Sequence, residues 1–449
     1  MRLIAWFSKP NTFFSHRGLM VLRAGAWSMV AKGCAAANLF VAVPFVLNSL
    51  GPLQFGAWAT LVSLVTFSGF LDFGLGNGTM NLVAAAHGRN EPAEVKAVIA
   101  QGQRTLTRVA LYLSGLLLVA FPFVSWHSLI GLPASMSRPS RLAAGIVLAS
   151  IMLAVPLNLA SRVQLGLGRG DRAFRWQAAG QLLALGLVTT LAKLHASLPV
   201  LTAAAISAPL VTAIANTLQL RRDIADISTE KAVERNDLGR TIRREGLLFF
   251  VLQLAAALAF SADLPLISLL RGAEDAGRYA IAQRLFGAIS IGLSLVWVPL
   301  WPVYRQALAA HSKDWVLRTL RRSAMAATSV AACLGLVFAV GFPQIVGLWV
   351  HRALNLSPWM LAGFAVWVVI EALGTSIATF LNAASIMRLQ IVLAVAFGIL
   401  CISLKAAVAA NYGIAPLPWA TVITYATVSL IPTLVLLRKL IRTALTKTY

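Results

Sequence analysis

Five ionisable residues interrupt the long apolar stretches of this 449-residue chain, and their side chains are the ones that could do chemistry inside a membrane. They are two bases and three acids: Lys32, Arg284, Asp72, Asp263 and Glu371. A charged side chain costs about 2.5–3.5 kcal/mol or more at the centre of a bilayer unless it faces a cavity or a partner. We therefore expect each of the five to bind, couple or pair.

The two bases are candidates for holding an anionic headgroup in a water-filled cavity. No orientation rule requires them where they are, because they lie far from the cytoplasmic clusters of basic residues. Lys32 falls near the middle of its predicted span and Arg284 in the outer half of its own. Arg284 has an alternative, an ion pair with Asp263 on the preceding span at similar depth. Both alternatives stay open.

The three acids have different candidate roles. Asp263 is interpreted mainly as a structural partner. Asp72 lies near the cytoplasmic end of the second predicted span, where we expect a packing or gate residue at the break before Gly74. Glu371 is a candidate for proton or ion coupling, since an acid within a span is a functional hypothesis in its own right.

The chemistry of an enzyme is missing from the sequence. The six histidines are scattered without HxxxH or HExxH spacing, and the three cysteines form no CxxC pair, so we expect no metal site. The glycine-rich segments 74–78 and 166–171 are not phosphate-binding P-loops, and no cofactor is expected. The longest outer loop, about residues 125–140, contains no carboxylate for glycosyl chemistry. We predict that the chain is not an enzyme.

The elements that must position these residues follow from composition. The chain is 59% hydrophobic and 12% charged, with a mean hydropathy of +0.79. This excludes a single soluble core and intrinsic disorder, and predicts an all-α polytopic membrane protein. The net charge of +23 does not indicate nucleic acid, because the basic residues fall in short gaps between apolar runs.

About twelve runs are long enough to cross a bilayer as helices. They are residues 24–48, 54–78, 106–124, 141–161, 174–192, 198–220, 246–270, 278–304, 324–348, 358–383, 390–409 and 415–437.

The distribution of Lys and Arg predicts the orientation. With both termini in the cytoplasm, 29 of these residues fall on the cytoplasmic side and 7 on the other. The seven outer residues are Arg138, Arg141, Lys193, Arg271, Arg278, Arg352 and Lys405. On this count Lys32 and Arg284 are the only bases within spans.

A polar segment at 221–244 divides the chain into halves, residues 1–220 and 245–449, each with six predicted spans. It is interpreted as a cytoplasmic linker. A short repeat supports the division, because four residues of the first half recur in the second at a constant offset of 221. Gly51, Gly56, Trp58 and Ala59 match Gly272, Gly277, Tyr279 and Ala280. We therefore predict two six-helix bundles related by pseudo-twofold symmetry around a central cavity.

Residues 51–89 resemble the second-span region of bacterial polysaccharide flippases, the Wzx-type O-antigen and exopolysaccharide transporters. These belong to the MOP superfamily of multidrug, oligosaccharidyl-lipid and polysaccharide exporters. The resemblance is carried by Gly51, Gly56 and Trp58, by the run from Asp72 to Gly76, and by Asn81.

The resemblance implies alternating access that moves undecaprenyl-pyrophosphate-linked oligosaccharide across the bacterial inner membrane. Related lipid II flippases have basic residues on the first and eighth spans, where Lys32 and Arg284 fall. Expected partners are this substrate, membrane lipids and the glycan polymerase or glycosyltransferase machinery, and nothing in the sequence requires more than a monomer. The alternatives are a cation-coupled multidrug exporter of the same superfamily and a membrane-embedded glycosyl or acyl transferase.

Overall fold

All regular secondary structure in the described part of the chain is helical. The computed structural model describes residues 16–65, 71–89, 91–225, 239, 250–251, 254–255, 257–309, 313–352, 354–384, 386 and 388–446. The N-terminal helices are α2 (His16–Leu64), α3 (Leu75–Gly88), α4 (Pro92–Ala120), α5 (Trp126–Leu129), α6 (Ser137–Leu157), α7 (Leu159–Gly166), α8 (Gly170–Lys193) and α9 (Leu198–Ala225). The C-terminal helices are α11 (Asp263–Arg271), α12 (Ala273–Ala309), α13 (Lys313–Val340), α14 (Phe342–Val350), α15 (Pro358–Ala383), α16 (Arg388–Tyr412), α17 (Leu417–Tyr425) and α18 (Ile431–Thr446).

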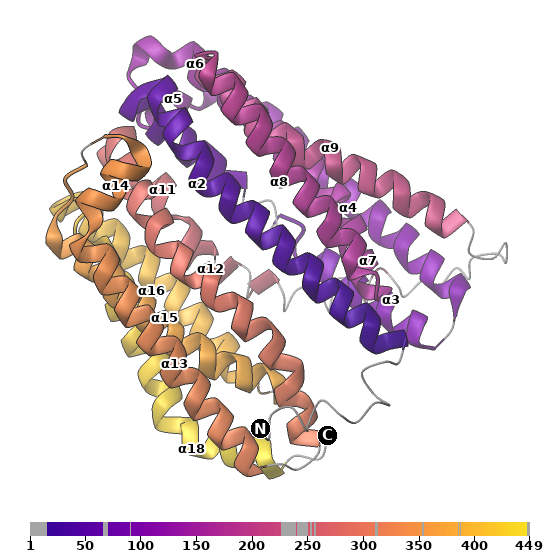
Figure 1. Ribbon diagram of the computed structural model, residues 1–449. Helices are drawn as coiled ribbons and strands as arrows, with labels where there is room; N and C mark the ends of the chain where they lie inside the picture. Colours follow the sequence, from indigo (N-terminus) through magenta and orange to yellow (C-terminus); the bar gives the residue numbers. More distant parts are fainter. Residues whose placement is uncertain are drawn as a thin grey trace.

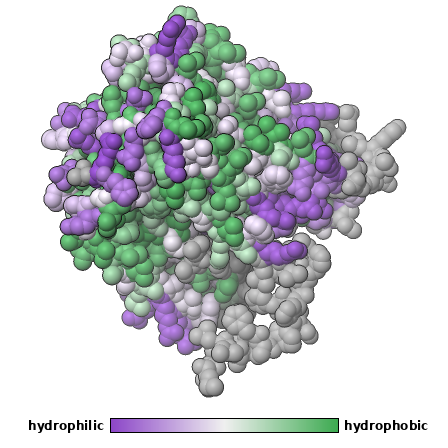
Figure 2. All heavy atoms as spheres, turned by 45° about the horizontal axis from the view of Figure 1, so that its top comes forward, coloured by the Kyte–Doolittle hydropathy of each residue, from purple (hydrophilic) through white to green (hydrophobic). Residues whose placement is uncertain are grey.

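The chain is a multi-pass membrane protein, as predicted. Among the described residues, eight helices are long and apolar enough to cross a bilayer. Large apolar side chains are exposed on many of them, and Figure 2 shows such residues over much of the visible surface. α3 has only 14 residues, and α8 begins with charged residues. Twelve spans therefore remain a prediction.

The helices form two groups (Figure 1). α2 packs on α8, α8 on α9 and α9 on α6, whereas α13 and α12 pack on α15. Contacts between α2 and α12 join the groups, and the largest buried apolar cluster includes Phe55 of α2 and Phe286 of α12. The linker predicted at 221–244 begins as the last turn of α9, and its remainder, apart from residue 239, lies outside the described residues.

The residues of the predicted repeat have matching structural roles. Gly51 breaks α2 at φ 73° and ψ 172°, and Gly272 separates α11 from α12 at φ 94° and ψ 168°. Side chains are strained at such positive φ values, so both breaks favour glycine. Gly56 and Gly277 lie against each other, since a Cβ on Gly277 would lie 3.0 Å from the Gly56 Cα. Contact between equivalent residues is what a twofold axis between the halves produces.

We expect Gly56→Ala to destabilise the protein strongly. A Cβ at this position would lie 1.5 Å from the carbonyl oxygen of Ala273, so the backbones of α2 and α12 must separate. The thermal unfolding temperature of the purified protein in detergent is the measurement. Gly186→Ala in α8 is the matched control, because a Cβ there meets nothing within 4 Å. Equal unfolding temperatures for the two variants would show that the glycine contact is dispensable.

Candidate binding site

Arg284 of α12 is a half-buried base whose side chain has no polar partner among the described residues. Its Nη1 atom makes no hydrogen bond to any described residue. The guanidinium lies over two rings of α2 instead, 5.7 Å from the centre of Phe55 and 5.5 Å from that of Trp58. Such cation–π contacts are favourable but leave N–H groups unsatisfied. The two rings therefore hold the Arg284 side chain in place while its N–H groups remain available to a ligand.

Arg284 lines a cavity of about 580 Å³, which is within the size range of ligand sites. Most of its wall comes from the N-terminal group, from α2, α6, α8 and α9. The other polar residues that line it are uncharged: Asn38, Ser150, Asn158, Gln177 and Gln181. Among the described lining residues, Arg284 carries the only charge. A half-buried cation facing a cavity without a carboxylate favours an anionic ligand.

Lys32, the second predicted headgroup ligand, lies at a different position along the axis of α12 from Arg284. Its Nζ donates a hydrogen bond of 3.2 Å to Ser294 Oγ, which joins α2 to α12. Ser294 and Arg284 are ten residues apart on α12, which is roughly 15 Å along the helix axis. The structure therefore does not bring Lys32 and Arg284 to one short ligand group in this conformation.

The alternative pairing of Asp263 with Arg284 is wrong. Asp263 of α11 binds Lys405 of α16, with 2.6 Å between Oδ1 and Nζ, and accepts a hydrogen bond of 3.0 Å from the Tyr279 hydroxyl. Lys405 is 1% exposed and lies within the candidate span Leu389–Tyr412, so its omission from the bases within spans is also wrong. The sequence held the signal, because residue 405 lies inside the predicted span 390–409. The count of bases within spans should have included it.

Glu371 of α15 faces a second cavity, of about 220 Å³, in the C-terminal group. Its carboxylate accepts a hydrogen bond of 2.6 Å from Ser290 of α12. Asp263 and Lys405 line the same cavity, so two of the predicted acids lie together there. Gln283 lines this cavity, whereas its neighbour Arg284 lines the larger one. α12 is therefore the wall that the two cavities share.

Asp72 stabilises the break that precedes α3. Its Oδ1 accepts a hydrogen bond of 2.8 Å from the backbone N–H of Gly74, which adopts φ 72°. Phe73 also has a positive φ, of 51°. A Cβ on Gly76 would lie 2.6 Å from Asp72 Oδ2, so the carboxylate closely covers the start of the helix. The acid thus satisfies backbone N–H groups that a helix start leaves without partners.

Sequence reasoning missed the amide side chains of the larger cavity. Asn38 donates a hydrogen bond of 2.9 Å to Gln181, which connects α2 with α8. Gln177 and Gln181 are four residues apart and therefore share one face of α8. Polar residues at helical spacing within the predicted span 174–192 were the available signal.

Solved structures of transporters share this fold. An inward-facing multidrug resistance transporter of the MATE family, of the MOP superfamily, has a TM-score of 0.75 and 14% identity, over 94% of this chain and 99% of that chain. A MOP transporter from Pyrococcus furiosus, described as having a binding pocket of reverse polarity, has a TM-score of 0.67 and 16% identity, over 96% of each chain. An outward-facing MATE transporter has a TM-score of 0.65 and 17% identity, over 96% of each chain.

The described helices share the fold of these solved transporters. No curated protein is significantly similar to the chain in sequence. The family of polysaccharide biosynthesis proteins matches residues 21–306, and the chain belongs to this family. The predicted resemblance to a polysaccharide biosynthesis family is thereby confirmed, and the chain has the fold of solved MOP superfamily transporters.

We expect Lys405→Met to destabilise the transporter. Removing one partner of a buried ion pair leaves an uncompensated charge, which costs about 3–5 kcal/mol. Asp263 would retain only the Tyr279 hydroxyl as a partner. Thermal unfolding of the purified protein measures the effect, with Lys439→Met at an exposed position as the control. The double change Asp263→Asn, Lys405→Met should recover much of the loss, and failure to recover would contradict the pairing argument.

Proposed function

We propose that this protein is a flippase for undecaprenyl-pyrophosphate-linked oligosaccharide in the bacterial inner membrane. The substrate enters from the cytoplasmic leaflet, and alternating access of the two halves exposes it to the outer leaflet. Both chain termini lie in the cytoplasm, as the distribution of 29 and 7 basic residues favours.

One observation carries the proposal, the unpartnered guanidinium of Arg284 in a large cavity without carboxylates. A pyrophosphate leaves water only where positive charge and N–H donors replace its hydration. The guanidinium suits this role, because it binds phosphate oxygens through two parallel hydrogen bonds. Membership of the polysaccharide biosynthesis family supports a glycan-linked headgroup as the anion.

Contacts between the two groups of helices support a conformation that is closed at one end. The Ala273 N–H donates to the Gly131 carbonyl at 3.2 Å, and the Trp349 indole donates to the Phe40 carbonyl at 2.7 Å. Figure 1 places the surrounding helices α5, α11 and α14 at one end of the molecule. In the predicted orientation this is the outer end. Because the two groups of helices contact each other there, substrate reaches the larger cavity from the cytoplasmic side.

A multidrug exporter of the same superfamily is the competing function, and the sign of the cavity charge separates the two. Cationic drugs need carboxylates where they bind. The larger cavity has none among its described lining residues. In the smaller cavity, Asp263 is neutralised by Lys405, and the Glu371 carboxylate accepts a hydrogen bond from Ser290. The larger cavity therefore favours an anionic substrate over a cationic drug.

Depletion of the protein in its own host tests the proposal. Lipid-linked oligosaccharide is extracted, and its exposure on the outer leaflet is measured by labelling intact spheroplasts. We expect complete units that accumulate on the inner leaflet and are not labelled from outside. Shortened or unmodified units would indicate a transferase instead. Normal glycan with increased drug sensitivity would indicate an exporter, and either result would overturn the proposal.

A further inference from the structure

The larger cavity continues into a second one in the N-terminal group. This neighbouring cavity has a volume of about 350 Å³ and is distinct from the cavity that contains Glu371. Asn158, Gln177 and Gln181 line both it and the larger cavity. Asn158 and Gln177 are exposed, so these cavities are open and not sealed. Together they form a continuous space along α8 and α9 that begins at Arg284. We call it the amide slot.

The polar side chains between the ends of the amide slot are uncharged. Those that the first cavity does not already include are Ser161, Trp176, Thr212 and Asn216. Charge is confined to the two ends, with Arg284 at one and Asp72 with Arg162 at the other. The slot thus offers donors and acceptors over its length without a charge to pair with a charged ligand.

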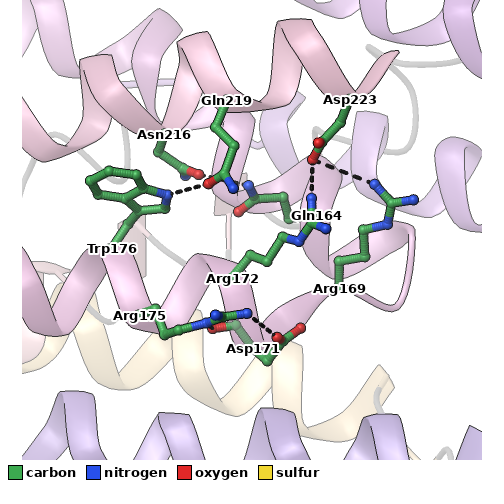
Figure 3. Close-up of polar contacts among 9 residues, drawn as sticks. All are labelled: Gln164, Arg169, Asp171, Arg172, Arg175, Trp176, Asn216, Gln219 and Asp223. Carbon is green, nitrogen blue, oxygen red and sulfur yellow. Dashed lines mark hydrogen bonds and ion pairs between the residues drawn. The ribbon is translucent and has the colours of Figure 1, made fainter. Parts of the chain in front are cut away.

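The far end of the amide slot is ordered by its own hydrogen bonds (Figure 3). The Trp176 indole donates to Gln219 at 2.6 Å, and the buried Asn216 accepts from Gln164 at 2.6 Å. Beyond them, Arg169 and Arg172 of the loop before α8 and its first turn pair with Asp223 of α9. These charges are satisfied by one another outside the slot, so the slot itself keeps a neutral lining.

Two amides of the slot have their hydrogen-bonding groups available. Within the described part of the chain, the side chains of Asn158 and Gln177 form no hydrogen bond with another residue. An amide presents two N–H donors and a carbonyl acceptor, which matches the hydroxyl and acetamido groups of sugars. Between the ends of the slot, where neither Arg284 nor Arg162 lies, a carboxylate on a sugar would lose its hydration without a cation to replace it.

We propose that the amide slot binds uncharged sugar units next to the lipid pyrophosphate. This inference rests on the proposed function and deepens it. Arg284 holds the pyrophosphate, the sugars lie along α8 and α9, and the N-terminal half alone recognises the polar part of the substrate. The transported unit is therefore neutral where it adjoins the headgroup.

Calorimetric titration of the full chain in detergent tests the inference with three probes. Citronellyl pyrophosphate alone measures binding of the headgroup. Citronellyl pyrophosphate linked to N-acetylglucosamine adds a neutral sugar, and citronellyl pyrophosphate linked to galacturonic acid adds an acidic sugar. We expect the neutral probe to bind about tenfold more tightly than the headgroup probe, as one or two extra hydrogen bonds provide. The acidic probe should show no such gain.

Variants locate the gain in the slot. Asn158→Leu with Gln177→Leu should abolish the gain, while citronellyl pyrophosphate should still bind. Gln283→Leu is the matched control, because this amide lines the other cavity one residue before Arg284. A gain that survives the double change, an equal gain for galacturonic acid, or no gain at all would overturn the inference.

The same titrations separate failure of the inference from failure of the proposed function. Citronellyl pyrophosphate that binds wild type and not Arg284→Met, with no gain from a sugar, would refute the slot and leave the flippase standing. A gain from the neutral sugar with unchanged headgroup binding in Arg284→Met would support the slot and refute the headgroup site. No binding of any probe would overturn both.

Discussion

Arg284→Met is expected to abolish transport of lipid-linked oligosaccharide while leaving the fold intact. Methionine keeps an unbranched apolar stem beside Phe55 and Trp58 and removes the guanidinium. The lost cation–π contacts and the removal of an unsatisfied buried donor are both about 1–2 kcal/mol and of opposite sign. The unfolding temperature should therefore change little. Transport is measured in proteoliposomes as the fraction of labelled lipid-linked oligosaccharide that reaches the opposite leaflet.

Arg284→Lys is the informative companion to this change. It keeps the positive charge and loses the planar fork that binds phosphate through two hydrogen bonds. We expect partial transport from it. Wild-type transport in Arg284→Met would show that the guanidinium does not bind substrate. A loss of transport could not be attributed to a broken ion pair with Asp263, because the partner of Asp263 is Lys405.

Lys32→Ala is expected to reduce transport by at least about tenfold, the equivalent of about 1.4 kcal/mol. No carboxylate lies within 4 Å of Lys32 among the described residues, and its hydrogen-bond partner is the Ser294 hydroxyl. An ammonium ion in a span is costly, and a single neutral hydrogen bond of about 1 kcal/mol does not account for it. The same proteoliposome assay measures the effect.

Ser294→Ala is the matched control for Lys32. It removes the hydrogen bond between α2 and α12 and keeps the charge. We expect near-normal transport from this variant. Equal losses in the two variants would mean that Lys32 acts only as a link between helices.

The sequence was sufficient for the class of fold, because hydropathy and charge act locally. Long apolar runs fix which segments become spans, and the glycine repeat located the two breaks at Gly51 and Gly272. Five of the charged residues within spans were found for the same reason, since an ionisable group stands out in an apolar run, but Lys405 was assigned to the outer side and missed.

The partners of those charges could not be predicted, because they depend on which helices pack together. Asp263 and Lys405 are 142 positions apart, and their contact exists only because α11 lies beside α16. The amide slot was missed for a related reason. Its side chains come from α2, α6, α7, α8, α9 and α12, each of which contributes only a few polar residues, and only their convergence forms a site.

The glycine contact between α2 and α12 lies near one end of the long helix α12, in the position of a hinge. Gly277 lies close to the start of α12, and 32 further positions lead from it to Ala309, roughly 48 Å of helix. A rotation of about 10° at that contact would carry the far end of α12 by about 8 Å, a simple consequence of this length. A small rotation at the glycine contact would thus produce a much larger displacement at the opposite end of α12.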